Sequence, residues 1–347
     1  MSEGACILKC LTSPGHRRSG ARQLKWAPGC TSTCALLTHI VLLCVSGVNC
    51  AQGSAEPPFT LKHIGPNVWA AIDNANATAP AAANAGFVIG DDAVTVIDTF
   101  WSVEAATQLL AAIHRQTKLP VKFVINTHYH LDHVAGNGIF ADAGAVVLAQ
   151  RKVRGWIHTE NLRLLGTYLT PELKALTEAV VSPMVVYDQG VDLYLGAREI
   201  QVRSFPGHTD GDSIVLIPDA RIVFAGDLFW RGMLPNLVDA STKPWIDTLD
   251  TLLAQNEPGY TFVPGHGDVG SGRDVAAFRE YLMTLRTLVA QAEAQGKSGD
   301  ALAETVMPTL RARYGHWDFI ESLAKDNLLQ TDAELSGKKR IPRVQAD

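Results

Sequence analysis

Short apolar runs separated by turn residues dominate the chain from Phe59 onward. Residues 67–72, 86–89 and 93–98 have the length and the content of β-branched and aromatic residues that are typical of strands. Gly90-Asp91-Asp92, between the second and third run, is typical of a hairpin turn. The pattern therefore predicts three successive strands, of which the last two form a hairpin.

A helical pattern follows these strands. Apolar residues recur at three- and four-residue intervals over residues 103–113, and Ser102 precedes them as a helix cap. The apolar run at residues 121–125 then predicts a buried strand. A short helix from about Val134 and a strand at residues 145–148 are expected next.

The rest of the chain divides into three regions. Residues 151–183 are expected to be helical and irregular, with a helix start at Thr170-Pro171-Glu172. A second series of elements follows, with a helix over 244–254 and strands at 184–187, 192–195, 199–205, 213–217, 222–225 and 260–263. Residues 272–335 contain the pattern of three helices. Strands and helices mixed in two successive halves predict an α/β layered domain with a helical C-terminal extension.

Composition narrows the class of protein. The 347 residues are 47% hydrophobic and 19% charged, whereas disordered chains are poor in apolar residues and rich in charge. A net charge of −5 argues against a nucleic-acid partner, which needs a basic surface. All six cysteines lie in the first 50 residues, so the chain after them has no disulfide framework, cysteine metal ligand or thiol nucleophile.

The first 50 residues differ from the rest in charge. They carry five Lys or Arg residues but one acidic residue, Glu3, and residues 35–48 are largely apolar. A basic stretch, a short apolar core and small residues at 53–55 predict a secretory signal peptide over residues 1–55. Its cleavage would leave an exported, periplasmic or secreted protein without stable membrane insertion. The alternatives are a membrane anchor, for which the apolar core is short, and a leader lengthened by a wrongly assigned start.

The candidate chemistry is concentrated directly after the strand at residues 121–125. His128, His130, Asp132 and His133 supply three imidazoles and one carboxylate within six residues. Such groups are costly to bury unless something binds them. On a loop after a strand they can turn toward one point, as metal ligands must. We therefore expect a metal site; the alternative is a solvated histidine-rich turn.

Three further segments have a similar setting, in which a predicted strand is followed by a glycine-containing loop. They are Gly207-His208, Gly226-Asp227 and Gly265-His266. Each alone would be a surface turn, but with the first motif they make a set of five histidines and two aspartates at strand ends. The other six histidines lack this context and are expected to be ordinary surface or core residues: His16, His39, His63, His114, His158 and His316.

The ordered set H-x-H-x-D-H, Gly-His, Gly-Asp and Gly-His resembles the metallo-β-lactamase superfamily of metallohydrolases over about residues 59–270. The resemblance implies a four-layer αββα sandwich, with the ligand loops along one edge where the two sheets meet. The chain would then consist of the leader, a catalytic domain over residues 56–270 and a helical C-terminal extension over residues 271–347.

The resemblance also implies two metal ions held by these seven residues. The implied groups are His128, His130 and His208 for one ion, Asp132, His133 and His266 for the other, and Asp227 as the bridge. Nitrogen and carboxylate donors without sulfur suit Zn²⁺, with Fe or Mn as alternatives. Two ions about 3.5–4 Å apart can activate a shared water and stabilise the oxyanion formed on attack. Asp132 would orient the nucleophile and pass a proton to the leaving group.

Residues next to the ligand motifs are candidates for supporting roles. Asp98 follows the strand at residues 93–97 and would either orient a ligand histidine or cap a turn. The neighbouring large side chains would either form substrate walls or belong to the core: Phe100, Trp101, Trp230, Arg231 and Met233.

The resemblance implies a zinc hydrolase of an ester, thioester, lactone or amide bond in a small molecule. The Gly-Asp bridge is similar to that of hydroxyacylglutathione hydrolases, and the layout with a leader resembles exported quinoprotein relay-system members. β-Lactamases with a cysteine ligand carry that cysteine where Asp227 stands here. The alternatives are a β-lactam hydrolase, an iron-dependent oxidoreductase on the same fold, and a non-catalytic metal-binding scaffold.

Overall fold

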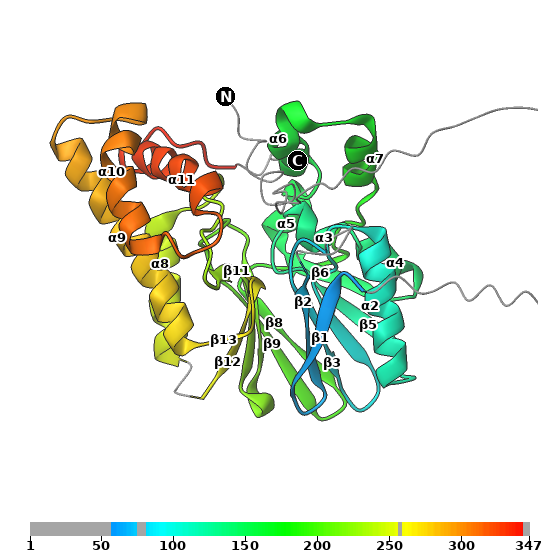
Figure 1. Ribbon diagram of the computed structural model, residues 1–347. Coiled ribbons are helices and arrows are strands. Elements are labelled where there is room, and N and C mark those ends of the chain that lie inside the picture. Colours follow the sequence, from blue (N-terminus) through cyan, green and yellow to red (C-terminus); the bar gives the residue numbers. More distant parts are fainter. Residues whose placement is uncertain (1–56, 75–80, 256–258, 343–347) are drawn as a thin grey trace, which may run out of the picture. The chain divides into compact units, whose positions relative to one another are not determined.

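Two β-sheets form the centre of the protein (Figure 1). The computed structural model describes residues 57–74, 81–255 and 259–342, so the expected signal peptide lies outside the described residues. The strands of the first sheet follow chain order: β1 (Phe59–Gly65), β2 (Val68–Asp73), β3 (Ala85–Ile89), β4 (Val94–Ile97), β5 (Val121–Ile125), β6 (Val146–Gln150) and β7 (Val185–Tyr187). Neighbours are antiparallel from β1 to β4 and parallel from β4 to β7.

The second sheet comes from the second half of the chain. Its strands, in spatial order, are β13 (Gly270–Ser271), β12 (Thr261–His266), β11 (Ile222–Trp230), β10 (Ser213–Ile217), β9 (Arg198–Ser204) and β8 (Gly190–Leu195). Only β11 and β12 are parallel to each other. Because parallel strands end at the same edge of a sheet, the C-terminal residues of β11 and β12 lie together.

Helices complete the fold on both outer faces and at the edge. Their bounds are α2 (Val103–Gln116), α3 (Leu131–Val134), α4 (Asn137–Asp142), α5 (Arg151–Trp156), α6 (Thr159–Leu165), η1 (Gly166–Tyr168), α7 (Pro171–Ala179), η2 (Pro218–Ala220), α8 (Thr242–Gln255), α9 (Gly272–Ala294), α10 (Gly299–Tyr314) and α11 (Ile320–Leu335). As expected, Ser102 caps α2, because its side chain accepts a hydrogen bond from the backbone N–H of Ala105 at 3.1 Å.

Three hydrophobic cores separate four layers. Val88 of β3 and Val215 of β10 belong to the core between the two sheets. Leu109 of α2 packs in a second core on the outer face of the first sheet. Trp245 of α8 and Phe278 of α9 pack in a third, on the outer face of the second sheet. Burial of a side chain of this size contributes about 1.5–3 kcal/mol to folding. The predicted αββα sandwich is thus confirmed.

The helical C-terminal region is also confirmed. Helices α9, α10 and α11 share a hydrophobic core with α8 and β11, and Figure 1 shows them on the outer side of the second sheet. All described residues fall in one compact unit. The domain border at residues 270 and 271 stays a prediction. No helix in the described ranges is long and apolar enough to cross a membrane.

Several expected loops are regular structure instead. Asp132 and His133 lie in α3, not in a loop. The strand expected at residues 222–225 continues to Trp230, so that Asp227 is a strand residue, and β12 likewise includes His266. The expectation of loops failed because the glycines there do not end the strands. At Gly226, where φ is +50°, the pairing of β11 with β12 shifts in register and the strand continues.

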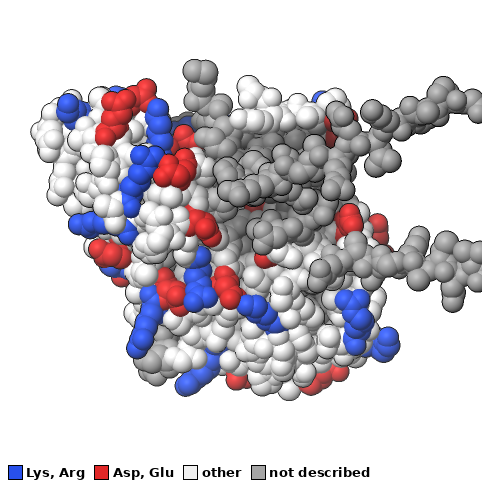
Figure 2. Space-filling model, viewed as in Figure 1, with Lys and Arg blue, Asp and Glu red and all other residues white. Residues whose placement is uncertain are grey.

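Charged side chains on the surface are mixed in sign. Figure 2 shows Lys and Arg side chains interspersed with Asp and Glu side chains over the coloured part of one face. Several charged residues in the described ranges form exposed ion pairs, such as Arg311 with Glu321 and Lys325 with Asp300. Such pairs contribute little to stability. The choice of a small-molecule partner over a nucleic acid stays a prediction.

Candidate metal centre

The seven predicted residues come together at one edge of the sandwich. His128 and His130 lie in the connection after β5, Asp132 and His133 in α3, His208 between β9 and β10, Asp227 in β11, and His266 at the end of β12. The first four therefore follow a strand of the first sheet, and the last three belong to the second sheet or its loops. The site lies where the two sheets meet.

Two groups of donor atoms are close enough to hold metal ions. His128, His130, His208 and Asp227 form one group, and Asp132, His133 and His266 form the other; within each group the donor atoms lie within 4.8 Å of one another. In the first group, Nε2 of His208 is 2.9 Å from Nδ1 of His130. In the second, Nε2 of His266 is 3.4 Å from Oδ2 of Asp132.

The Asp227 carboxylate lies between the two groups. Its Oδ2 is 3.1 Å from Nε2 of His208 and 3.8 Å from Nε2 of His128. Its Oδ1 is 3.1 Å from Nε2 of His133 and 3.4 Å from Nε2 of His266. One oxygen thus faces each group, which is the arrangement that a carboxylate bridging two cations requires.

Several donor atoms in this site lack partners within the described part of the chain. Nε2 of His128, Nε2 of His133 and Oδ1 of Asp227 are buried and make no hydrogen bond there. A buried polar atom without a partner costs about 1–3 kcal/mol. Cations held by the two donor groups would satisfy these atoms, so the residues fit a metal centre.

The electrostatics of the buried groups agree with this fit. Burial, together with the charge of His133, lowers the pKa of His128 well below its usual range, and burial lowers the pKa of His208 to about 3. Burial opposes ionisation of Asp227, but the imidazoles, His266 and His133 foremost, hold the pKa of its carboxyl well below its usual range. Neutral imidazoles and an ionised carboxylate are the forms that bind metal.

Positive charge is favoured beside His133. Burial disfavours the imidazolium, but the Asp227, Asp98 and Asp132 carboxylates raise the pKa of His133 well above its usual value. Three carboxylates around one ring call for a compensating cation. A metal ion held by the second group would supply that charge in place of a proton.

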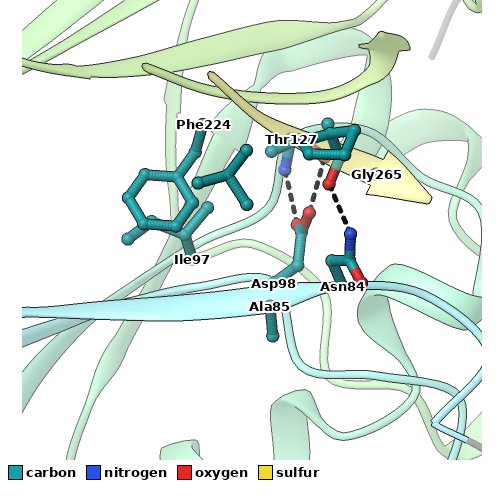
Figure 3. Close-up of a pocket in the computed structure, with 10 residues that line it drawn as sticks. Asn84, Ala85, Ile97, Asp98, Thr127, Phe224 and Gly265 are labelled. Carbon is teal, nitrogen blue, oxygen red and sulfur yellow. Dashed lines mark hydrogen bonds between the residues drawn. The ribbon is translucent and has the colours of Figure 1, made fainter. Parts of the chain in front are cut away.

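Asp98 contacts His133 of the site, which is one of the two roles expected for it. Its Oδ2 is 2.8 Å from Nδ1 of His133, so the carboxylate holds the ring with Nε2 directed toward Asp227. It also accepts hydrogen bonds from the backbone N–H of Thr127 at 2.8 Å and from the Thr127 hydroxyl at 2.7 Å (Figure 3). The residue thus fixes both the ring and the start of the connection that carries His128.

Asn84 fixes the end of β12. Its side-chain amide donates to the carbonyls of Pro264 at 2.9 Å and Gly267 at 2.7 Å, and its backbone N–H donates to the carbonyl of Gly265. A Cβ at Gly265 would lie 1.9 Å from Oδ1 of Asp227, so only glycine allows β12 to pass this close to the carboxylate. His266 follows directly.

Four of the five expected wall residues have other surroundings. Phe100 is fully buried and stacks on Phe59, so of its two expected roles it has that of a core residue. Arg231 pairs with Asp274, and the two remaining side chains, Trp101 and Met233, pack against hydrophobic clusters. Trp230 is buried and stacks on His266, with ring centroids 3.9 Å apart.

Two buried aspartates that were not predicted support the histidines. Oδ2 of Asp239 is 3.6 Å from Nε2 of His130, and Asp212 accepts a hydrogen bond from the backbone N–H of Thr209 at 2.7 Å, next to His208. Asp212 lies in a Gly-Asp pair, Gly211-Asp212, shortly after His208, and this pattern could have indicated its role. Asp239 lies in no such motif, so the sequence gives no indication of its role. Four histidines in the described ranges were expected not to be ligands, and they lie in neither donor group: His63, His114, His158 and His316.

Comparison with known families fits this geometry. Residues 78–266, more than half of the chain, match the family model described as the metallo-β-lactamase superfamily. The chain belongs to the metallo-β-lactamase superfamily.

Two curated members of the superfamily illustrate the relationship. The metallo-β-lactamase type 2 of Bacillus cereus is 24% identical over 218 residues, covering 61% of this chain and 78% of that protein. The linear primary-alkylsulfatase of a Pseudomonas species is 23% identical over 275 residues, covering 65% of this chain and 51% of that protein. This chain therefore spans about half the length of the alkylsulfatase.

A solved superfamily member has the same fold. The metallo-β-lactamase from Pontibacter korlensis superposes with a TM-score of 0.54 at 22% identity, covering 65% of this chain and 99% of that structure. Since the curated relatives bear the names of hydrolases, this chain is a metallohydrolase of the superfamily with a His/Asp metal-binding cluster.

Proposed function

We propose that the protein is a dinuclear zinc hydrolase that cleaves an ester, thioester, lactone or amide bond in a small molecule. The observation that supports this most is the position of the Asp227 carboxylate, with one oxygen toward each donor group. Five imidazoles and two carboxylates, with no sulfur donor among them, form a set that suits zinc; iron and manganese are the alternatives.

The ligand residues would hold the ions, and the ions would activate a water for attack and stabilise the oxyanion that forms. Asp132 is the residue that we assign to the proton. Its side chain is 16% exposed, more than any other of the seven, and it lies at the open side of the second group. A carboxylate there can orient the attacking water, take up its proton and deliver it to the leaving group.

Residues behind the ligands would keep the reacting centre rigid. Asp98 holds His133, and Trp230 covers one face of His266, so neither ring can rotate away from its donor group. The Trp245 ring lies edge-on to His208 at 5.5 Å between centroids, and its N–H donates to the carbonyl of Leu228. A fixed ligand set needs little rearrangement when charge develops in the transition state.

A second candidate function is hydrolysis of β-lactams. The similarity to the Bacillus cereus metallo-β-lactamase favours it. The carboxylate of Asp227 argues against it, because β-lactamases with a cysteine ligand have a thiolate at that position. An iron-dependent oxidoreductase would use the same ligands, and the two classes differ in whether oxygen is consumed.

The test combines metal analysis with a substrate panel. Metal content is measured by mass spectrometry, and hydrolysis is then assayed on a β-lactam, a lactone, a thioester and a phosphodiester, with oxygen uptake recorded in parallel. We expect about two zinc ions per chain and turnover of at least one carbonyl substrate, which Asp227→Asn abolishes and the surface variant Asp219→Asn does not. Bound iron with oxygen uptake would contradict the proposal.

We also propose that residues 1–55 direct export and are removed. A basic stretch followed by the apolar residues 35–48 and small residues at 53–55 supports this. The test is N-terminal sequencing of the mature protein from the culture medium or periplasm. A start between Ala51 and Glu56 is expected, and material that begins at Ser2 would contradict export.

A further inference from the structure

The segment after α11 returns to the catalytic body. Gly337 (φ +70°) makes the turn at the end of α11, and the red segment in Figure 1 then leaves α11 toward α5 and α6. Lys339 is half-buried there, and its Nζ donates to the carbonyls of Leu237 at 2.6 Å and Ala240 at 2.5 Å. This ammonium therefore holds both sides of a short stretch, Val238-Asp239, in the loop between β11 and α8.

Asp239 connects that stretch to the candidate metal centre. Its side chain is buried; Oδ2 lies 3.6 Å from Nε2 of His130 and accepts a hydrogen bond from the Tyr129 hydroxyl. The other ring nitrogen of His130, Nδ1, faces Nε2 of His208 in the first donor group. Asp239 is thus placed to fix the ring of His130 from behind.

A second route leads from the next residue, Arg340, to the same carboxylate. The guanidinium of Arg340 donates to both oxygens of Glu160 in α6 at 2.9 Å, in the two-pronged geometry that orders both groups. Glu160 in turn accepts from Nε of Arg163 at 2.5 Å. Nη2 of Arg163 donates to Oδ1 of Asp239 at 2.6 Å. The chain of contacts is continuous from Arg340 to the aspartate.

We propose that Lys339 and Arg340 form a clamp that positions His130 for metal binding, with Asp239 as the point on which both routes converge. The proposal rests on the proposed function, because it takes His130 as a metal ligand. Lys339 fixes the backbone on either side of Asp239, and Arg340 fixes its side chain through Glu160 and Arg163. Groups behind a metal-bound histidine set its orientation and its affinity for metal.

The experiment measures Co²⁺ affinity on the full chain, by competition with a chelating dye and by the visible absorption of bound cobalt. Arg340→Ala and Lys339→Met are each expected to raise the Kd of one of the two cobalt ions about tenfold. Residues that hold a metal ligand in place typically change metal affinity by about 10–100-fold, and these two act on His130 only indirectly. Arg340→Lys, which keeps the charge but not the two-pronged pair, should lie between Arg340→Ala and the wild type.

The chain offers matched controls. Arg311 makes a similar two-pronged pair with Glu321 between α10 and α11, and Lys325 pairs with Asp300. Arg311→Ala and Lys325→Met should leave the Kd of both ions unchanged, whatever they do to the melting temperature. If Arg340→Ala and Lys339→Met behave like these controls, the residues only stabilise the fold and the proposal is overturned.

A double variant tests the route. Because the clamp acts through Asp239, adding Arg340→Ala to Asp239→Asn should raise the cobalt Kd no further than Asp239→Asn alone. Additive effects would mean that Arg340 acts elsewhere and would also overturn the proposal. If the wild type binds no cobalt, or if His130→Ala leaves cobalt binding unchanged, the proposed metal centre itself fails and the clamp with it.

Discussion

The Asp98 carboxylate lies 2.8 Å from Nδ1 of His133, and the opposite nitrogen of the same ring lies 3.1 Å from Oδ1 of Asp227. The imidazole is therefore held between two carboxylates that follow or belong to strands of different sheets. When Nδ1–H of His133 donates to Asp98, the neutral ring is fixed in the tautomer that carries its proton on Nδ1. Nε2 then has a free lone pair that can bind a cation.

Asp98→Asn should weaken metal binding without unfolding the protein. The amide keeps the shape of the side chain but removes the charge that orients the ring and raises its basicity, so a loss of about 10–100-fold in the affinity for one zinc ion is expected. A zinc competition titration measures it, and Asp219→Asn on the surface is the control. Equal affinities of the variant and the wild type would show that Asp98 serves only as a turn cap for Thr127.

The Asp227 bridge should be needed for both ions. Asp227→Asn leaves the volume unchanged but removes the negative charge that offsets two divalent cations, so metal content should fall from about two ions per chain toward one or none. Asp227→Cys should also weaken the paired site, because a thiolate is larger and softer than a carboxylate oxygen. Full occupancy and full activity of Asp227→Asn would contradict the bridging role.

Asp132→Ala should remove turnover while the fold is retained. Asp132 is the most exposed of the seven residues, so its removal costs little packing, but it removes the group assigned to the proton. Activity should drop by well over tenfold, which corresponds to more than about 1.4 kcal/mol of barrier. Circular dichroism checks the fold, and a variant that keeps a tenth or more of the activity would assign the proton to another residue.

Glu160 should make the protein acid-sensitive. Burial opposes its ionisation, but Arg340 and Arg163 hold the pKa of its carboxyl below the ordinary 4.5. A carboxylate with a lowered pKa in the fold stabilises the protein above its unfolded-state pKa, and this contribution is lost as the pH falls through the folded-state pKa.

Urea unfolding between pH 7 and pH 3 measures this effect. The difference in unfolding free energy between the wild type and Glu160→Gln should be largest near pH 7 and should shrink below about pH 4.5. Glu321→Gln, which breaks an exposed pair with Arg311, is the control. A difference that stays constant with pH would mean that the ionisation of Glu160 does not contribute.

The sequence predicted the seven-residue cluster because its members share one local setting, and the dense first motif gives weight to three segments that are weak alone. His128 to His133 form a dense motif, and His208, Asp227 and His266 each follow a glycine. The strands at residues 121–125 and 213–217 were predicted to the residue, because long apolar runs have clear limits. Whether the seven residues bind metal in the expected groups stays a prediction.

The parts that were missed depend on contacts between distant segments. Nothing near Asp239 in the sequence indicates that three successive ion pairs link it to Arg340 through Arg163 and Glu160. Nor does the sequence indicate that the ring of His130 lies beside its carboxylate. The extension of β11 beyond Ala225 was missed because glycine usually ends a strand. Here the parallel partner β12 continues the pairing past a register shift, which only the assembled sheet determines.

The origin of the donor atoms has a consequence for how the protein assembles. Each donor group has two residues from the 128–133 segment, which follows β5 of the first sheet. The remaining donors come from the second sheet or its loops: His208 and Asp227 in one group, His266 in the other. Neither half of the chain alone contains three donors of either group. Ions bound there would act as cross-links between the halves, so metal withdrawal should loosen the sandwich itself, and a chain with its sheets still apart would have no site to fill.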